Sequence, residues 1–175
     1  MKAVMISIKP KWVEKIANGE KTIEVRKTAP KEVPFKCYIY ETKGQYVKFT
    51  HGAHTKYGYG RGKVIGWFIC DKVDEYHYDY CDGVDIDDDT ILETAIDRED
   101  INIYAKGKTF YGWHISDLKI YDKPKELSEF YTKKKCNSCN KSGYESTACM
   151  YDEDCKVPMS ITRAPQSWQY IEDLG

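Results

Sequence analysis

The sequence predicts a small α+β domain that is mostly β-strand, with several short strands and two or three short helices. Its 175 residues fit a single domain, since one hydrophobic core typically serves about 100 to 200 residues. The apolar segments are short and are separated by long connections, and only a few stretches have helical spacing. This pattern favours a small, mostly antiparallel barrel with helices at its ends.

The chain is expected to begin with a strand, a helix and a second strand. Residues 3–8 form an apolar run that predicts a buried strand. Pro10 suits a first helical turn, and Gly19 suits the end of that helix. Residues 22–27 alternate apolar and charged side chains, which predicts a half-buried strand. The apolar face of the helix contains Trp12, Val13, Ile16 and Ala17, and that of the second strand contains Ile23 and Val25.

The next segment combines two strands with a long connection. Residues 37–41 are expected to form a short strand, and residues 64–73 the strongest strand of the chain. Between them, residues 43–63 are rich in Gly, Tyr and His. We expect a long loop there, with an irregular strand around residues 46–49.

The second half begins with an acidic run at residues 82–89, which we expect to be solvated. Thr90 and Glu93 have the spacing of a capping box, which predicts a short helix through Ala95. A second helical turn is expected near Asp97. Two further strands are expected at residues 110–121 and, closing the fold, at residues 168–172.

Charge is distributed unevenly along the chain, although the net charge is only −1. Residues 1–63 contain 14 Lys and Arg against 5 Asp and Glu, a net charge of +9. Residues 64–104 contain 2 against 13, a net charge of −11. A basic third of this kind is the electrostatic footprint of a polyanion binder, and it also occurs as a solvated lysine face.

Compartment signals favour the cytoplasm. The longest apolar run, residues 64–70, is far shorter than the roughly 20 residues that a membrane span needs. The first ten residues lack the apolar length and the cleavage site of a secretory signal. The seven cysteines are an odd number, which in an intracellular chain indicates thiols or metal ligands. We expect no membrane association.

Residues 19–26, GEKTIEVR, are the main functional signature. Glu24 and Arg26 lie two apart on one strand face and can pair, and Lys21 stands at the entry of the strand. By spacing alone this is an ordinary surface pair, which contributes about 0 to 1 kcal/mol.

Longer stretches of the chain resemble the ASCH domain family, a branch of the PUA-like fold, and particularly its bacterial and prophage members. The resemblance touches both ends and the middle of the chain, so that it covers essentially the whole sequence. The matching segments are ISIKP at 6–10, IANGEKTIEVR at 16–26, VIGWF at 64–68, YGWHI at 111–115 and PQSW at 165–168.

The resemblance implies a pseudo-barrel of five to six strands, with a cleft beside residues 19–26 that binds RNA or another nucleic acid. Lys21, Glu24 and Arg26 match the charged motif of the family, and Lys9 matches the basic residue after the first strand. Lys9, Lys21 and Arg26 can meet phosphates, whereas Glu24 can orient Arg26 or accept from a base amino group. We expect recognition of an unpaired or modified nucleotide, with RNA, DNA and a free nucleotide all open.

Two further groups are candidates for nucleic-acid binding. Residues 51–63 interleave basic and aromatic residues with glycines, a composition that suits either base stacking along a backbone or a flexible surface loop. Trp168 is expected on the closing strand, either in the core or as a stacking wall. The candidates in the loop are His51, His54, Lys56 and Arg61.

A cysteine-bearing insertion is expected at residues 132–160, before the closing strand. Its cysteines have the spacing C-x2-C-x9-C-x5-C, and four thiolates in a short polar segment suit a structural, tetrahedral Zn²⁺ site. The alternatives are free thiols or an oxidised pair, and the segment can also serve to dock a protein partner. The proposed ligands are Cys136, Cys139, Cys149 and Cys155.

An enzyme is the alternative to a binding module. Some small ASCH-like proteins are amidohydrolases that act on acylated cytidine, and others show ribonuclease activity. Lys21 matches the amidohydrolase lysine, but Glu24 stands where those enzymes have a threonine. Lys21 and Glu24 are therefore the candidate catalytic pair of a hydrolase acting on an acylated nucleoside or RNA, while binding without catalysis is the favoured interpretation.

Overall fold

The structure is a computed structural model, and it describes residues 1–51, 54–79, 81, 83–135 and 156–174. Within these residues the chain is mostly β-strand, with three α-helices. The helices are α1 (Pro10–Ala17), α2 (Asp88–Thr94) and α3 (Arg98–Ala105), with a short 3-10 helix η1 (Leu127–Glu129). The strands are β1 (Lys2–Ile8), β2 (Ile23–Arg26), β3 (Phe35–Glu41), β4 (Gly44–His51), β5 (His54–Gly60), β6 (Lys63–Cys70), β7 (Val73–Tyr76), β8 (Tyr78–Asp79), β9 (Gly83–Val84), β10 (Phe110–His114), β11 (Ser116–Lys125), β12 (Tyr131–Lys135), β13 (Lys156–Ser160) and β14 (Trp168–Ile171).

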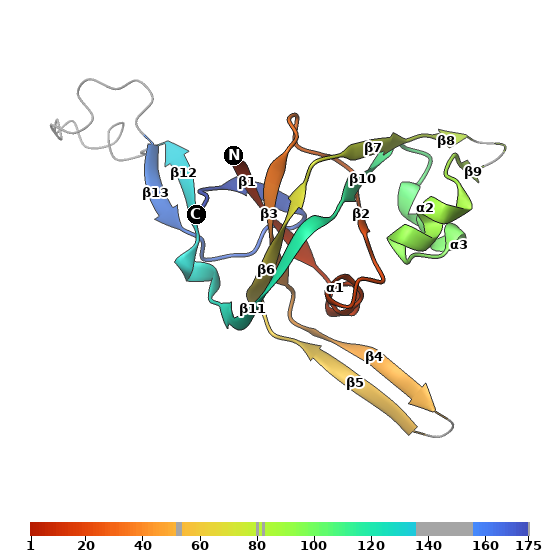
Figure 1. The fold of residues 1–175 in the computed structure, drawn as a ribbon, viewed down its shortest axis with the longest axis horizontal. Helices are drawn as coiled ribbons and strands as arrows, with labels where there is room; N and C mark the ends of the chain where they lie inside the picture. The colour runs from red at the N-terminus through yellow and green to blue at the C-terminus, as the bar shows by residue number, and fades with distance from the viewer. Residues whose placement is uncertain (52–53, 80, 82, 136–155, 175) are drawn as a thin grey trace, which may run out of the picture.

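Two sheets form the body of the protein (Figure 1). The larger has five strands in the order β11-β6-β3-β1-β14, and the smaller has the order β2-β10-β7. The pair β1–β3 is parallel, whereas the other pairs in these two sheets are antiparallel. Across the described residues the two sheets do not join into one closed hydrogen-bonded barrel. The predicted α+β, mostly β fold class is confirmed.

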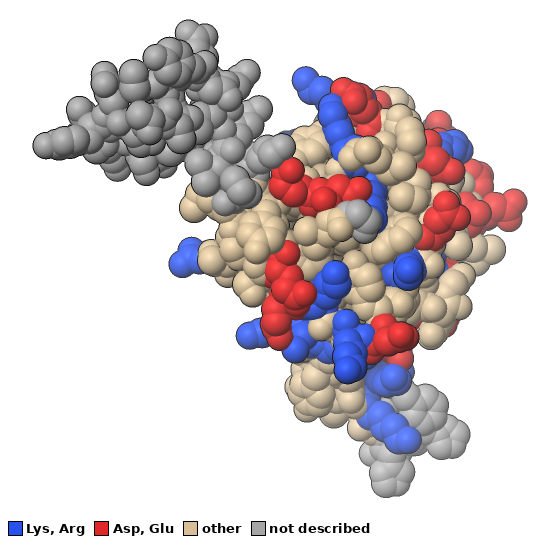
Figure 2. Space-filling view, turned by 60° about the vertical axis from the view of Figure 1, so that its left-hand side comes forward, with Lys and Arg blue, Asp and Glu red and all other residues tan. Residues whose placement is uncertain are grey.

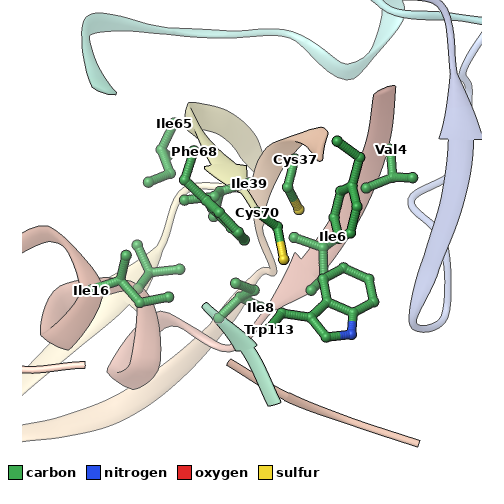
Figure 3. Packing of buried hydrophobic residues seen from close by; sticks show 12 residues of the cluster. Val4, Ile6, Ile8, Ile16, Cys37, Ile39, Ile65, Phe68, Cys70 and Trp113 are labelled. Carbon is green, nitrogen blue, oxygen red and sulfur yellow. The ribbon is translucent and has the colours of Figure 1, made fainter. Parts of the chain in front are cut away.

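One hydrophobic core joins the two sheets (Figure 3). It combines buried side chains from β1, α1, β3, β6 and β10. Trp113 of the smaller sheet is fully buried and meets Phe35 of the larger sheet edge to face, with ring centroids 5.1 Å apart. Trp168 of β14 also contacts Trp113 edge to face, at 5.6 Å. Because aromatic pairs of this kind bury large areas, Trp113 contributes to holding the two sheets together.

Two of the places where the chain passes from one sheet to the other are adjacent. The chain leaves the larger sheet between β6 and β7, and it returns between β10 and β11. The crossings are joined by a hydrogen bond from His114 N–H to the Lys72 carbonyl (3.0 Å). Residues 64–73 and 110–121 were each expected to form a single strand, which is wrong for both. Asp71 and Lys72 interrupt the apolar run at the first crossing, whereas apolar Ile115 continues the pattern through the second.

The irregular strand expected at residues 46–49 is confirmed as part of β4, whose pairing shifts register between Val47 and Phe49. The long loop expected around it at residues 43–63 is wrong, because β4 and β5 form an antiparallel hairpin that projects from the body (Figure 1). Its glycines indicated a loop but have a packing role. A Cβ at Gly58 would lie 2.4 Å from the Tyr46 ring across the hairpin. One at Gly60 would lie 1.9 Å from the Thr42 carbonyl oxygen. The glycines therefore allow close approach within a strand.

The helices after the acidic run differ from prediction at one cap. The cap of α2 is Asp87, whose carboxylate accepts the Thr90 N–H at 2.8 Å and the Thr90 hydroxyl at 2.7 Å. Thr90 is thus a residue of the first turn, and the predicted capping box is wrong. The helical turn expected near Asp97 is confirmed as the start of α3. None of the helices in the described ranges is long and apolar enough to cross a membrane.

Gly66 tests the close packing of β6 against β11. A Cβ at this position would lie 2.2 Å from the carbonyl oxygen of Lys119. We expect Gly66→Ala to lower the free energy of unfolding by about 1 to 3 kcal/mol, because the backbone of β11 must move. Urea denaturation measures the effect. Lys119→Ala, which removes an exposed side chain and keeps that carbonyl, is the control, and an equal loss in both variants would contradict the close-approach explanation.

Candidate functional site

A cleft of about 740 Å³ lies beside β2. Its walls come from α1, from β2 and from α3, so that residues far apart in sequence meet there. The predicted residues Lys9, Lys21, Glu24 and Arg26 all line it. Other lining residues are Lys11, Trp12, Lys27, Asp100, Tyr104 and Lys106.

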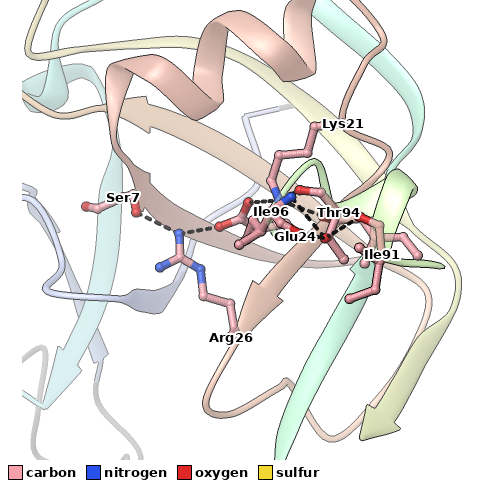
Figure 4. Close-up of polar contacts among 8 residues, drawn as sticks. Ser7, Lys21, Glu24, Arg26, Ile91, Thr94 and Ile96 are labelled. Carbon is pink, nitrogen blue, oxygen red and sulfur yellow. Dashed lines mark hydrogen bonds and ion pairs between the residues drawn. The ribbon is translucent and has the colours of Figure 1, made fainter. Parts of the chain in front are cut away.

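Lys21 is buried at the base of the cleft, with only 1% of its surface exposed. Its ammonium donates to the carbonyl oxygens of Ile23 (2.8 Å) and Thr94 (2.7 Å), and lies 3.4 Å from Glu24 Oε2 (Figure 4). Thr94 ends α2, where carbonyl groups lack helical partners and the helix dipole favours a cation. Lys21 therefore ties β2 to the end of α2.

The environment of Lys21 lowers its pKa from the ordinary lysine value. Burial is the main cause, because it disfavours the charged ammonium. The negative charge and hydrogen bond of Glu24 oppose this shift by favouring the ammonium. Nearby positive charge on Arg26 and Lys15 lowers the pKa further. The neutral amine is thus more accessible here than in a solvated lysine.

Glu24 links the two cations. Its Oε1 accepts from the guanidinium of Arg26 at 2.9 Å, while its Oε2 faces Lys21. The same Arg26 nitrogen, Nη2, also donates to the carbonyl oxygen of Ser7 at 2.7 Å, which ties β2 to β1 (Figure 4). The predicted Glu24–Arg26 pair is present, but with both side chains largely buried, at 7% and 14% exposure. Within the described residues, the buried Nε of Arg26 has no hydrogen-bond partner.

The rim of the cleft is basic and aromatic. Six basic and two acidic side chains line the whole cleft. The ammonium of Lys11 lies 4.1 Å from the centre of the Trp12 ring, and that of Lys27 lies 4.4 Å from the centre of the Tyr104 ring. Lys27 also donates to the carbonyls of residues 104 and 105 at the end of α3. The cleft can therefore hold an anionic group beside a flat ring.

Several of these residues were not predicted to line a site. Trp12 was assigned to the apolar face of α1, and it does pack against the core while also facing the cleft. Lys11 and Trp12 directly follow Lys9, so proximity in sequence was a usable signal. Tyr104 and Lys106 gave none, because α3 reaches the cleft only through the tertiary fold.

The remaining nucleic-acid candidates lie outside the cleft lining. Trp168 lies on β14, where its indole N–H donates to the Thr28 hydroxyl at 3.0 Å. The Arg61 side chain lies after β5, with its Nε 4.0 Å from Glu41, and Lys56 is exposed on β5. His51 and His54 are paired in the backbone register near the tip of the hairpin. The predicted residues thus divide between the cleft, the hairpin and β14.

The proposed zinc ligands Cys136, Cys139, Cys149 and Cys155 lie outside the described residues. The described part of the chain has no group of three or more His, Cys, Asp or Glu side chains that could hold a metal ion. Its three cysteines are free: Cys37 and Cys70 are buried and Cys81 is exposed. Burial raises the pKa of the Cys70 thiol to about 12, which makes it unreactive.

Glu24→Gln tests the buried charge chain. We expect it to lower the free energy of unfolding by about 3 kcal/mol, because Lys21 would keep a buried charge without its carboxylate partner. Denaturant titration at neutral pH measures the loss. The control is Glu32→Gln, which breaks the solvent-exposed pair between Lys2 and Glu32 (2.6 Å) and is expected to change nothing measurable. A loss as small as that of the control would show that the Glu24 pairs are not required.

Comparison with known proteins gives similarity in structure. No family model and no curated protein sequence matches the chain. A crystal structure of ASCH from Zymomonas mobilis matches 98% of this chain and 88% of its own, with a TM-score of 0.53 and 16% identity. Two point mutants of that protein match at 15% identity, with the same TM-score and coverage of 91% and 89% of their chains. This chain therefore has the fold of the ASCH domain, as the resemblance of its motifs predicts.

Proposed function

We propose that the protein binds RNA or another nucleic acid, and that the cleft beside β2 accepts one unpaired or modified nucleotide. The observation that carries the proposal is the excess of positive charge in the cleft. Six basic side chains against two acidic ones give its lining a net charge of +4. A concave site with this charge attracts phosphate groups, which supply most of the affinity of proteins for nucleic acids.

The aromatic side chains of the rim support a nucleotide over a simple anion. Trp12 and Tyr104 both line the cleft, and each already has a lysine ammonium near its ring. An unpaired base can stack on such a ring while the neighbouring ammonium meets its phosphate. The cleft volume of about 740 Å³ lies within the range of small-molecule sites.

Buried groups at the base of the cleft have a positioning role in this proposal. Lys21 donates to two carbonyl groups and lies beside Glu24, so it holds that carboxylate in place and leaves phosphate contact to the rim. Each carboxylate oxygen of Glu24 has a second lone pair and can accept from a base amino group. The buried Nε of Arg26 offers a further donor.

The rim lysines provide the test. We expect Lys9→Ala combined with Lys11→Ala to weaken binding of a single-stranded RNA 12-mer about tenfold near 0.1 M salt. Losing two phosphate contacts should also reduce the slope of log affinity against log salt by about 1.4. Fluorescence anisotropy over a salt series measures both quantities.

A matched control uses Lys123, an exposed residue that does not line the cleft. Lys123→Ala removes one positive charge where the double variant removes two, and it should change the affinity and the slope by far less than half as much. Both variants are expected to keep the thermal unfolding midpoint of the parent protein. Equal affinity for the parent and the double variant would overturn the cleft as the binding site.

A hydrolase in the same cleft is the second candidate, favoured by the lowered pKa of buried Lys21 beside Glu24. A lysine amine in its neutral form can act as a general base. In that case acyl-nucleosides or short RNAs would be turned over, at a rate that rises with pH as Lys21 deprotonates. Lys21→Met, which keeps the length of the side chain, would abolish turnover. Absence of turnover by the parent protein across the panel would exclude the hydrolase for those substrates.

A further inference from the structure

The β4–β5 hairpin extends away from the body of the protein, and its two faces differ (Figure 1). One face is anchored on α1 by Glu14, whose carboxylate accepts from the Tyr46 hydroxyl (2.9 Å) and from Lys48 Nζ (2.6 Å). The Tyr46 ring lies over Gly58 on this face. The hairpin is therefore held at a fixed angle to the helix that forms the rim of the cleft.

The opposite face of the hairpin is uncovered. Val47 is paired with Tyr57, and Gln45 with Tyr59, so these four side chains lie on the same face. Tyr57 is 52% exposed, Tyr59 is 70% exposed and Val47 is 58% exposed. Two aromatic rings two residues apart on one strand are thus presented side by side to solvent.

The charge of the hairpin indicates which class of partner binds this face. Residues 42–63 contain five Lys and Arg and no Asp or Glu. Lys56, beside Tyr57, is exposed and makes no ion pair within the described residues. Figure 2 shows Lys and Arg side chains along the described part of the hairpin, which lies at the lower right. A second copy would bring like charges together, whereas a polyanion complements this surface.

We infer that the exposed face of the hairpin binds single-stranded nucleic acid, with Tyr57 and Tyr59 stacking on successive unpaired bases. Arg61, which directly follows β5, meets a phosphate of the bound strand, and Lys56, which alternation places on the other face, adds to the positive charge of the hairpin. An exposed ring on a protein surface stacks on the face of a base that has been freed from its pair and its neighbours, so the strand must be single. The assignment names the ligand class of the proposed function and rests on it.

The cleft and the base of the hairpin are close to each other. Thr42 lines the cleft and comes two residues before β4 begins. Gly60, the last residue of β5 and the register partner of Gly44, packs close to the ring of Pro10, the first residue of α1. A strand with one nucleotide in the cleft therefore has the hairpin beside its exit, and binding should strengthen as the strand grows long enough to reach both.

The test measures the affinity of the full chain for a labelled, unstructured oligouridylate 12-mer. We expect Tyr57→Ala with Tyr59→Ala to weaken binding at least tenfold, since each lost stacking contact costs about fivefold or more. The salt slope should stay unchanged, because stacking releases no counterions. Tyr57→Phe with Tyr59→Phe keeps both rings and should retain the parent affinity. Tyr131→Ala, at a 40% exposed tyrosine off the hairpin, should also retain it.

The outcomes separate this inference from the proposed function. Unchanged affinity in the Tyr57/Tyr59 alanine variant, with weakened affinity in the Lys9/Lys11 variant, would overturn the hairpin and leave the cleft. The reverse pattern would support the hairpin and overturn the cleft. If the Tyr57/Tyr59 alanine variant lost the same factor of affinity for an RNA duplex of the same length, the single-strand assignment would be overturned. If the parent protein sediments as a dimer, and the alanine variant sediments as a monomer with unchanged RNA affinity, the face would be assigned to a second copy. No binding by the parent protein would overturn both proposals.

Discussion

The buried chain of charges from Lys21 through Glu24 to Arg26 is the constraint on which the arrangement of the site depends. At one end Lys21 binds the carbonyl that ends α2, and at the other Arg26 binds a carbonyl of β1. β2 is thereby fixed between a helix and the larger sheet, although among the described strands it is hydrogen-bonded only to β10. Removing three ionised groups from water is costly, and the cost is offset only while every member keeps its partner. Apolar side chains of similar volume could often fill such a space at no loss of stability, so a buried chain of charges is weak evidence for stability as its role.

The uneven charge of the sequence becomes a spatial separation in the fold. The basic N-terminal third supplies β1, α1, β2 and the hairpin, which are the elements around the cleft and its exit. The acidic stretch supplies β7 to α3, and only its last part reaches the cleft, where Asp100 is one of two acidic lining residues. The lining of the cleft therefore has an excess of positive charge in a protein whose net charge is nearly zero.

The sequence was sufficient for elements whose pattern is local. Pro10 and Gly19 bound α1 correctly, and the alternation from Thr22 placed β2 within a residue at each end. It was insufficient where the decisive contact is distant in the chain. The glycines of β5 are understood only once Tyr46 and α1 are in place against them, and the crossings at residues 71–72 and at Ile115 need the second sheet. Burial of Lys21 is of the same kind, because it is produced by α2, about seventy residues later. Motif resemblance identified the cleft residues on β2, but not Tyr104 or Lys106 on the opposite wall.

The pairing of β12 with β13 has a consequence for how such a protein can diversify. Lys135 and Lys156 are register partners, so the chain leaves the body and re-enters it at neighbouring strand ends. The entropic cost of closing a loop between two such ends grows only slowly with the length of the loop. The register of β12 and β13 is set by the pairing of the strands themselves. This tip is a natural site of insertion and exchange, where a lineage could acquire a new module while the cleft and its charge chain stay as they are.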